Sequence, residues 1–241
     1  IQFQIPGAVP FTISPLSPLP ALSAPVVIDA TTQPGYSNHP VVELNGTSAG
    51  GNTVGLRVVG GGSTVRGLAI NRFGRDGIRL DSSGNVIQAN YIGTDVTGTF
   101  ARGNGQEGVY VFNTSSNLIG GTNLADRNVI SGANDTGIYI QSGAGNVVQG
   151  NYIGVNAAGD ADLGNRNNGV AIYSAPANTI GGTVTGARNV ISGNDGSGIS
   201  VNSAESAGNV IQGNYIGVNA AGSGAISNTA DGITLNNAPA N

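Results

Sequence analysis

The sequence predicts an all-β protein, a right-handed parallel β-helix of about seven three-sided coils, and two observations lead to this prediction. The first is an internal repeat: the stretch NVIQANYIG at Asn85 recurs as NVVQGNYIG at Asn146 and as NVIQGNYIG at Asn209. The second is that apolar residues alternate with polar ones in short runs, which is the period of a β-strand. Conserved spacing of this kind indicates a solenoid, in which each residue stacks on its equivalent in the next coil.

The repeat contains two coils in a period of about 62 residues. Between the copies of the first motif stand NLIGG at Asn117 and NTIGG at Asn178, and each is followed by RNVISG. A sandwich or a barrel is the alternative for a chain of many short strands. Hairpins would not require the same residues at positions about 62 apart in the sequence, so the repeat favours the solenoid.

Each coil is expected to contain three strands. The first and second strands each contain an Asn-x-Ile motif. The third contains a Gly-apolar-x-apolar motif, which begins at Gly108, Gly137, Gly169, Gly198 and Gly232. Upstream, Gly67–Ile70 and Gly77–Leu80 are expected to continue this third pattern in a shorter coil. Val26–Ile28, Val41–Leu44 and Leu56–Val59 form one more set of three strands.

Stacked coils predict two internal columns of aliphatic side chains. One column begins at Ile87 and Ile119, and the other begins at Ile92 and Ile130. The repeated asparagines are expected to form a ladder, because an amide carries both a donor and an acceptor. The ladder residues of the first strand are Asn85, Asn117, Asn146, Asn178 and Asn209.

The whole chain, residues 1–241, is expected to be a single β-helix domain. Residues 1–52 form Pro-rich entry coils, residues 53–84 short coils, and residues 85–241 long regular coils. A solenoid needs polar caps, and Asn241 stands where another coil would begin. We therefore expect the chain to be a fragment of a larger protein.

Composition restricts the function. The chain has no Cys, so a disulfide scaffold and a thiolate metal site are excluded. It has no dense basic run and no apolar stretch long enough for a membrane span, so we expect neither nucleic-acid binding nor membrane insertion. No cofactor is expected.

The motifs at Asn85, Asn146 and Asn209, together with RNVISG at Arg127 and Arg188, resemble those of the bacterial secreted right-handed parallel β-helix repeat family. The entry segment from Ile28 to Tyr36 is also similar to the first coils of such proteins. The resemblance implies a secreted protein at the cell surface or outside the cell. It does not imply one activity, because this fold carries lyases, hydrolases, adhesins and passive stalks.

Candidate binding residues come from an arginine-rich segment and from the outward side of the third strand. No carboxylate stands in that outward column, and no acid pair, metal cluster or nucleophile triad is visible at matching positions. We therefore assign no catalytic residue and favour a function other than an enzyme. A solvated, salt-bridged patch is the simpler interpretation of the arginines. The candidates are Arg57, Arg66, Arg72, Arg75, Arg79, Tyr110 and Tyr139.

Long loops recur on every second coil, at residues 94–107, 155–168 and 218–231, each shortly after an outward tyrosine. We expect each loop to fold over its tyrosine, Tyr91, Tyr152 or Tyr215; the alternative is an exposed tyrosine array that binds glycan. Acids in these loops make calcium a candidate ligand. They are Asp95, Asp160, Asp162 and Asp231.

An apolar outward stripe on the first strand suggests packing against another copy or a neighbouring domain. It consists of Val86, Leu118, Val147, Thr179 and Val210. Three functions remain open. One is a structural or adhesive module that assembles end to end or laterally, and another is a domain that binds or cleaves a polysaccharide, such as a cell-surface glycan. The third is a phage-type tail fibre, which a trimeric state would favour.

Overall fold

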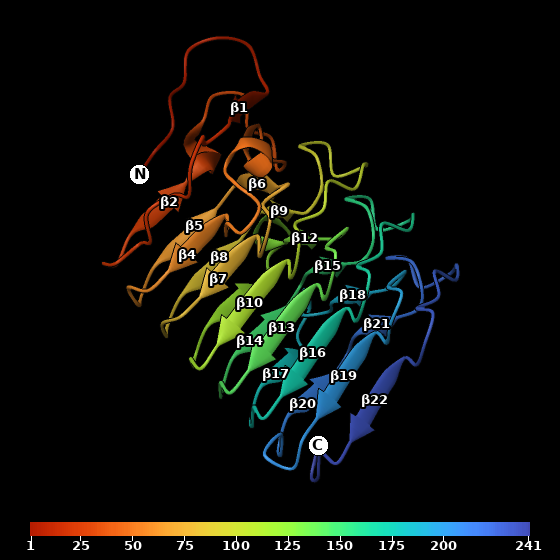
Figure 1. Ribbon diagram of the computed structural model, residues 1–241. Helices are drawn as coiled ribbons and strands as arrows, with labels where there is room; N and C mark the ends of the chain where they lie inside the picture. The colour runs from red at the N-terminus through yellow and green to blue at the C-terminus, as the bar shows by residue number, and fades with distance from the viewer.

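A computed structural model describes residues 1–241. The chain winds into a parallel β-helix, which confirms the predicted fold. Strands pair only with their equivalents one coil away, and every pair is parallel. Figure 1 shows the coils stacked in chain order, with long loops projecting from one edge.

Three sheets form the sides of the helix. The first sheet contains β2 (Val27–Asp29), β5 (Thr64–Arg66), β8 (Val86–Gln88), β11 (Leu118–Gly120), β14 (Val147–Gln149), β17 (Thr179–Gly181) and β20 (Val210–Gln212). The second contains β1 (Phe11–Ile13), β3 (Val42–Asn45), β6 (Leu68–Asn71), β9 (Tyr91–Ile92), β12 (Val129–Ile130), β15 (Tyr152–Ile153), β18 (Val190–Ile191) and β21 (Tyr215–Ile216). The third contains β4 (Leu56–Val58), β7 (Ile78–Leu80), β10 (Val109–Phe112), β13 (Ile138–Gln141), β16 (Val170–Tyr173), β19 (Ile199–Asn202) and β22 (Ile233–Asn236).

Three short 3₁₀ helices complete the secondary structure: η1 (Ala30–Thr32), η2 (Gly46–Ser48) and η3 (Leu124–Asp126). The chain forms no helix that is long and apolar enough to cross a membrane.

The core is the interior of the coil, where the predicted aliphatic columns lie in register. Ile87 pairs with Ile119, Ile119 with Val148, Val148 with Ile180, and Ile180 with Ile211. The second column, from Ile92 through Ile130 to Ile216, is equally continuous. Strands about 4.8 Å apart hold these branched side chains in contact along the axis.

Asparagine ladders run along the corners between the sheets, as predicted. Asn85 donates from Nδ2 to Asn117 Oδ1 at 3.0 Å, and Asn117 donates to Asn146 at 2.9 Å. The ladder continues through Asn178 and Asn209. Each Oδ1 also accepts the backbone N–H of the preceding asparagine, so that a buried amide satisfies two donors at once.

The short coil differs from the prediction for Gly67–Ile70. Leu68 to Asn71 forms β6, which belongs to the second sheet and pairs with β3 and β9, not to the third sheet. In this coil the first and second strands are separated only by Gly67, which has φ +80° and lies against the backbone of Thr31. Leu68 stands where the later coils have the asparagine of the Asn-x-Ile motif, and its N–H donates to Asn90 Oδ1 of the next coil at 3.1 Å, as the ladder asparagines do.

Candidate ligand-binding face

The outward surface of the third sheet carries one row of side chains in strict register. Arg57 of β4 pairs with Arg79 of β7, which pairs with Tyr110 of β10 and then with Tyr139 of β13. The row continues with small residues: Ala171, Ser200 and Thr234. The predicted outward column is therefore confirmed.

The large side chains of this row stack on one another. The rings of Tyr110 and Tyr139 are nearly parallel, with centroids 5.3 Å apart and an interplanar angle of 5°. The Arg79 guanidinium lies 4.7 Å from the centroid of Tyr110 and 5.0 Å from that of Phe112. Because Ala171 follows Tyr139 in the next coil, the stack ends at Tyr139.

The arginines at the N-terminal end of this face are largely paired. Arg57 and Arg79 share Asp81, at 2.6 and 2.9 Å, and Arg75 donates to Gln106. They line a groove of about 390 Å³, which we call the arginine groove. Its lining is Pro18, Leu19, Ala21, Asn52, Thr53, Val54, Arg57, Arg75 and Arg79.

The arginines of the predicted set do not form one cluster. Arg66 lies on the first sheet and pairs with Asp29 at 3.4 Å, and Arg72 follows the second-sheet strand β6 and pairs with Glu43 at 3.4 Å. A coil of three short strands turns through all three faces, so residues close in sequence point in different directions. Only Arg57, Arg75, Arg79, Tyr110 and Tyr139 come together on the third sheet.

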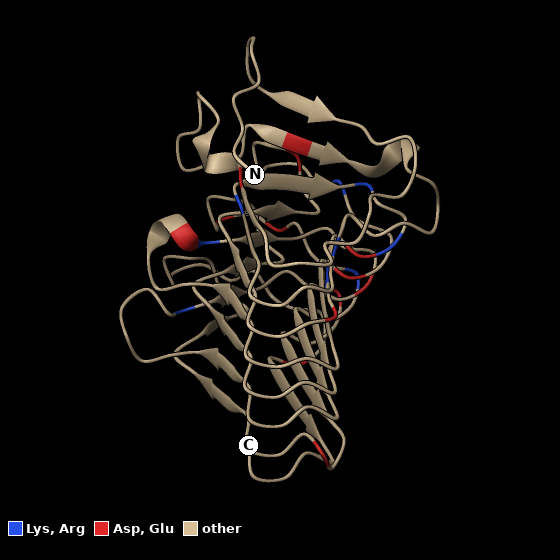
Figure 2. Cartoon of the chain, turned by 90° about the vertical axis from the view of Figure 1, so that its left-hand side faces the viewer, with Lys and Arg blue, Asp and Glu red and all other residues tan.

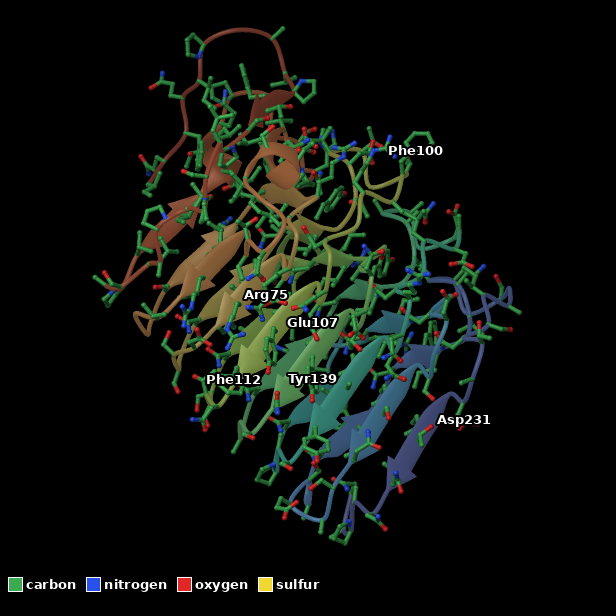
Figure 3. All side chains as sticks on the ribbon, viewed as in Figure 1. Arg75, Phe100, Glu107, Phe112, Tyr139 and Asp231 are labelled. Carbon is green, nitrogen blue, oxygen red and sulfur yellow. The ribbon has the colours of Figure 1, made fainter.

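A second groove begins where the stack ends, and we call it the Tyr139 groove. It has a volume of about 280 Å³ and is lined by Glu107, Asp135, Thr136, Tyr139, Asn167, Asn168, Ala171, Tyr173 and Asn202. Asp135 is held in place because it accepts hydrogen bonds from Asn167 at 3.0 Å and from Thr136 at 3.2 Å. Figure 3 shows Glu107 and Tyr139 on the same sheet face, with Arg75 nearby.

The structure also contains an acid pair at matching positions, which corrects the expectation that none exists. Asp76 and Glu107 each precede the glycine of a third strand, so they stand at matching positions one coil apart. Asp76 is fully buried, and its carboxyl group faces Glu107. Two ionised carboxylates cannot bond to each other, so the pair shares a proton.

Burial sets the protonation of this face. Desolvation, followed by the contact with Asp76, raises the pKa of Glu107 to about 8. Desolvation also raises the pKa of Asp76 and that of Tyr139, and it raises the pKa of Tyr110 to about 12. Glu107 is therefore protonated at neutral pH and is the donor to Asp76.

The tyrosines beside the long loops are covered, as the sequence predicts. Tyr91 and Tyr152 are both only 8% exposed, and the glycines of the loops lie against the rings. The guanidinium of Arg127 covers the ring of Tyr152 at 3.9 Å from its centroid. Arg188 covers Tyr215 at the same distance, so the repeated arginine of RNVISG packs on the next tyrosine. An exposed tyrosine array is therefore wrong for this edge.

The remaining sequence candidates are not gathered into a site. Asp95 accepts hydrogen bonds from Thr97 and from the N–H groups of its own loop. No three acidic, His or Cys side chains in the chain converge as metal ligands, and calcium at the loops stays a prediction. The apolar stripe of the first sheet is half-exposed to exposed, with Val210 at 45%. Self-packing through it also stays a prediction.

Comparison with known proteins agrees with the geometry. The family described as right-handed beta helix region matches residues 47–238, which is most of the chain. A search of curated proteins finds no match. The parallel sheets, the continuous internal columns and this match lead to one conclusion: the chain belongs to the right-handed β-helix family.

Proposed function

We propose that this chain is an adhesive β-solenoid module of the cell surface or extracellular space that binds a saccharide chain on the outward face of its third sheet. The observation that carries the proposal is the aromatic stack, which ends at Tyr139 beside an open groove. The resemblance to secreted β-helix repeats supports the location.

The face has the two kinds of contact that a sugar requires. The apolar C–H face of a pyranose ring packs on an aromatic ring, and Tyr139 has Ala171, a small residue, on its next coil. Hydroxyl groups need fixed donors and acceptors, which Asp135, Asn167 and Asn202 supply around that groove. The rigid coil holds these side chains in place, so little entropy is lost on binding.

The test is a glycan array followed by calorimetry with the best ligand. Tyr139→Ala removes the ring on which the sugar packs, and we expect binding to weaken by about tenfold or more. Phe100→Ala is the matched control, because Phe100 is 61% exposed and lies on a loop away from the groove (Figure 3). Equal binding by the Tyr139→Ala variant, or no glycan bound at all, would contradict the proposal.

A second candidate function is cleavage of the bound saccharide. Glu107 and Asp135 both line the Tyr139 groove, and their surroundings differ: Glu107 retains its proton while Asp135 accepts two hydrogen bonds. Glycoside hydrolysis uses two carboxyl groups that flank the bond to be cleaved, one of them as the proton donor. Release of reducing ends from the bound glycan, abolished in Glu107→Gln, would favour cleavage over adhesion.

A further inference from the structure

Each of the three arginines of the arginine groove is held in place by a hydrogen bond from its Nε. Arg57 and Arg79 donate to the two oxygens of Asp81, at 2.6 and 2.9 Å. Arg75 donates to Gln106 Oε1 at 3.1 Å. No acceptor of the chain bonds to the Nη groups of these side chains. The groove therefore keeps the paired N–H donors at the end of every guanidinium group, on side chains that are already fixed.

Two neighbouring coils bring these arginines together. Arg57 of β4 and Arg79 of β7 are register partners, so their backbones lie about 4.8 Å apart. Arg75 stands at the corner before β7, where its N–H donates to Thr53 O of the preceding coil at 2.9 Å. All three side chains line one groove of about 390 Å³. The Arg79 side chain is only 15% exposed and that of Arg57 is 53% exposed, so the groove joins a half-enclosed guanidinium group to solvent.

The groove keeps a positive charge after its acids are counted. Asp81 is the acid that forms salt bridges with its arginines. The buried carboxyl group of Asp76 lies near Arg75 and Arg79, but it forms no hydrogen bond with either. Three guanidinium groups thus face two carboxyl groups, which leaves one positive charge for a ligand. Figure 2 shows that charged residues concentrate on these N-terminal coils.

We propose that the arginine groove binds the sulfate ester group of a saccharide chain. A sulfate ester carries a single negative charge, which balances the groove, and its three terminal oxygens can accept hydrogen bonds from three guanidinium groups. A carboxylate has the same charge but only two oxygens, which lie in one plane. A phosphate ester carries more negative charge than the groove can balance. This inference rests on the proposed saccharide-binding function, which supplies the chain that carries the ester.

The arginine groove and the aromatic stack lie on the same sheet face. Arg79 pairs with Tyr110, and Tyr110 pairs with Tyr139, so Arg79 and Tyr139 are two coils, or about 9.6 Å, apart. Figure 3 shows Arg75 and Tyr139 on this face. A saccharide chain that lies along the coil axis can therefore pack one ring on Tyr139 and place the sulfate ester of another sugar in the arginine groove.

The experiment is calorimetry with a sulfated chondroitin hexamer and with its unsulfated form. Both chains carry the same carboxylates, so they differ only in the sulfate esters. We expect the sulfated hexamer to bind at least about tenfold more tightly, because the unsulfated form lacks the charge-assisted hydrogen bonds. Added salt should weaken binding of the sulfated hexamer more steeply, because it screens the additional charge contact.

Two variants test the named residues. Arg57→Gln and Arg75→Gln each remove one guanidinium group, and each should weaken binding of the sulfated hexamer by about tenfold without changing that of the unsulfated hexamer. Arg79 keeps its bond to Asp81 in both variants, and thermal unfolding followed by circular dichroism checks that the coils remain intact. Arg102→Gln is the matched control with the same charge change, because Arg102 lies on a long loop outside the groove.

The outcomes separate the inference from the proposed function. Equal affinity for the two hexamers, weakened for both by Tyr139→Ala, would overturn the sulfate inference and keep saccharide binding. Equal weakening of both hexamers in the two arginine variants would assign the groove to a carboxylate and would overturn the inference as well. A preference for sulfate that the arginine variants abolish and Tyr139→Ala leaves unchanged would support the arginine groove and contradict binding on Tyr139. If neither hexamer binds, the sulfate inference fails, and the glycan array decides the proposed function.

Discussion

The buried asparagines of the ladders are bonded along the coil axis, and the Asp76–Glu107 pair is not. Asn146 is typical: its Oδ1 accepts from the backbone and the side chain of Asn117, and its Nδ2 donates to Asn178. Such an amide is satisfied by copies of itself and has no capacity left for a ligand. Asp76 instead faces Glu107 of the next coil, and the two carboxyl groups share one proton.

That proton makes stability depend on pH. The folded pKa of Glu107, about 8, lies above its ordinary value of 4.5, so the folded state binds a proton that the unfolded chain has lost. The contribution is complete below about pH 4.5 and is lost as the pH rises through about 8. Glu107→Gln retains a donor for Asp76 at every pH.

We therefore expect wild type and Glu107→Gln to unfold with similar free energies at about pH 5, and the variant to be more stable by about 1 kcal/mol or more at about pH 9. Urea denaturation at both values measures the difference. Asp126→Asn should show no such divergence. Parallel stability curves for wild type and Glu107→Gln would contradict the shared proton.

The sequence predicts residues well where they repeat in one frame. The ladder from Asn85 to Asn209 is of this kind, as are the outward positions of the third strand. A further ladder, from Asn165 through Asn194 to Asn228, is not predicted. It covers fewer coils, because Ala133 stands one coil before Asn165 and separates the ladder from Asn104. The acid pair is not predicted, because Asp76 and Glu107 stand one residue before the strand glycine and not at an outward strand position.

At the scale of elements, the long loops and the strands they follow form a second apolar layer outside the coil. Tyr152 lies between Val129 and Val190 of the adjacent coils, and Val155 of its own loop and Tyr91, two coils away, belong to the same apolar cluster. Successive loops also bond to each other: Ala157 N donates to Gly98 O at 2.9 Å, and Ala220 N donates to Gly159 O at 2.8 Å. The loops are thus stacked elements with their own periodicity.

Tyr152→Ala should destabilise the protein by about 3–5 kcal/mol, because it removes a buried ring and the surface on which Arg127 packs. Tyr152→Phe keeps the ring, and its cost should stay below about 1.5 kcal/mol. Urea denaturation gives the free energies, and limited proteolysis at residues 155–168 reports the release of the loop. Equal protease resistance of the Ala and Phe variants would show that the ring does not hold the loop.

Element boundaries were predictable in the long coils and less so at the N-terminal end. The entry coil supplies only an isolated bridge at Gln2 before β1. The segment Gly67–Ile70 lies in these N-terminal coils too, and the sequence assigns it to the third sheet although it forms a strand of the second. With few coils to compare, a Gly-apolar-x-apolar run does not reveal which sheet it enters.

At the scale of the whole molecule, a solenoid is a sum of coils and of the contacts between neighbours. This chain alternates coils with a long loop and coils without one, so its true unit is two coils. The hydrogen bonds between successive loops skip one coil. The Arg127–Tyr152 and Arg188–Tyr215 contacts join adjacent coils, and they repeat once per two-coil unit. Deleting coils is therefore a test of which unit carries the stability.

Removal of residues 117–177 deletes one two-coil unit and joins Ser116 to Asn178. In the shortened chain Asn85 can donate to Asn178, and the loop that contains Gly98 can bond to the loop that contains Ala220. Removal of residues 146–177 deletes one coil, and it leaves Arg127 without Tyr152 and the two remaining loops too far apart to bond. We expect the shorter chain to be the more stable of the two, by about 1–3 kcal/mol. Urea denaturation, monitored by circular dichroism, measures the free energy of unfolding of both variants. If the one-coil deletion is the more stable, each coil stabilises its neighbour independently of the loops.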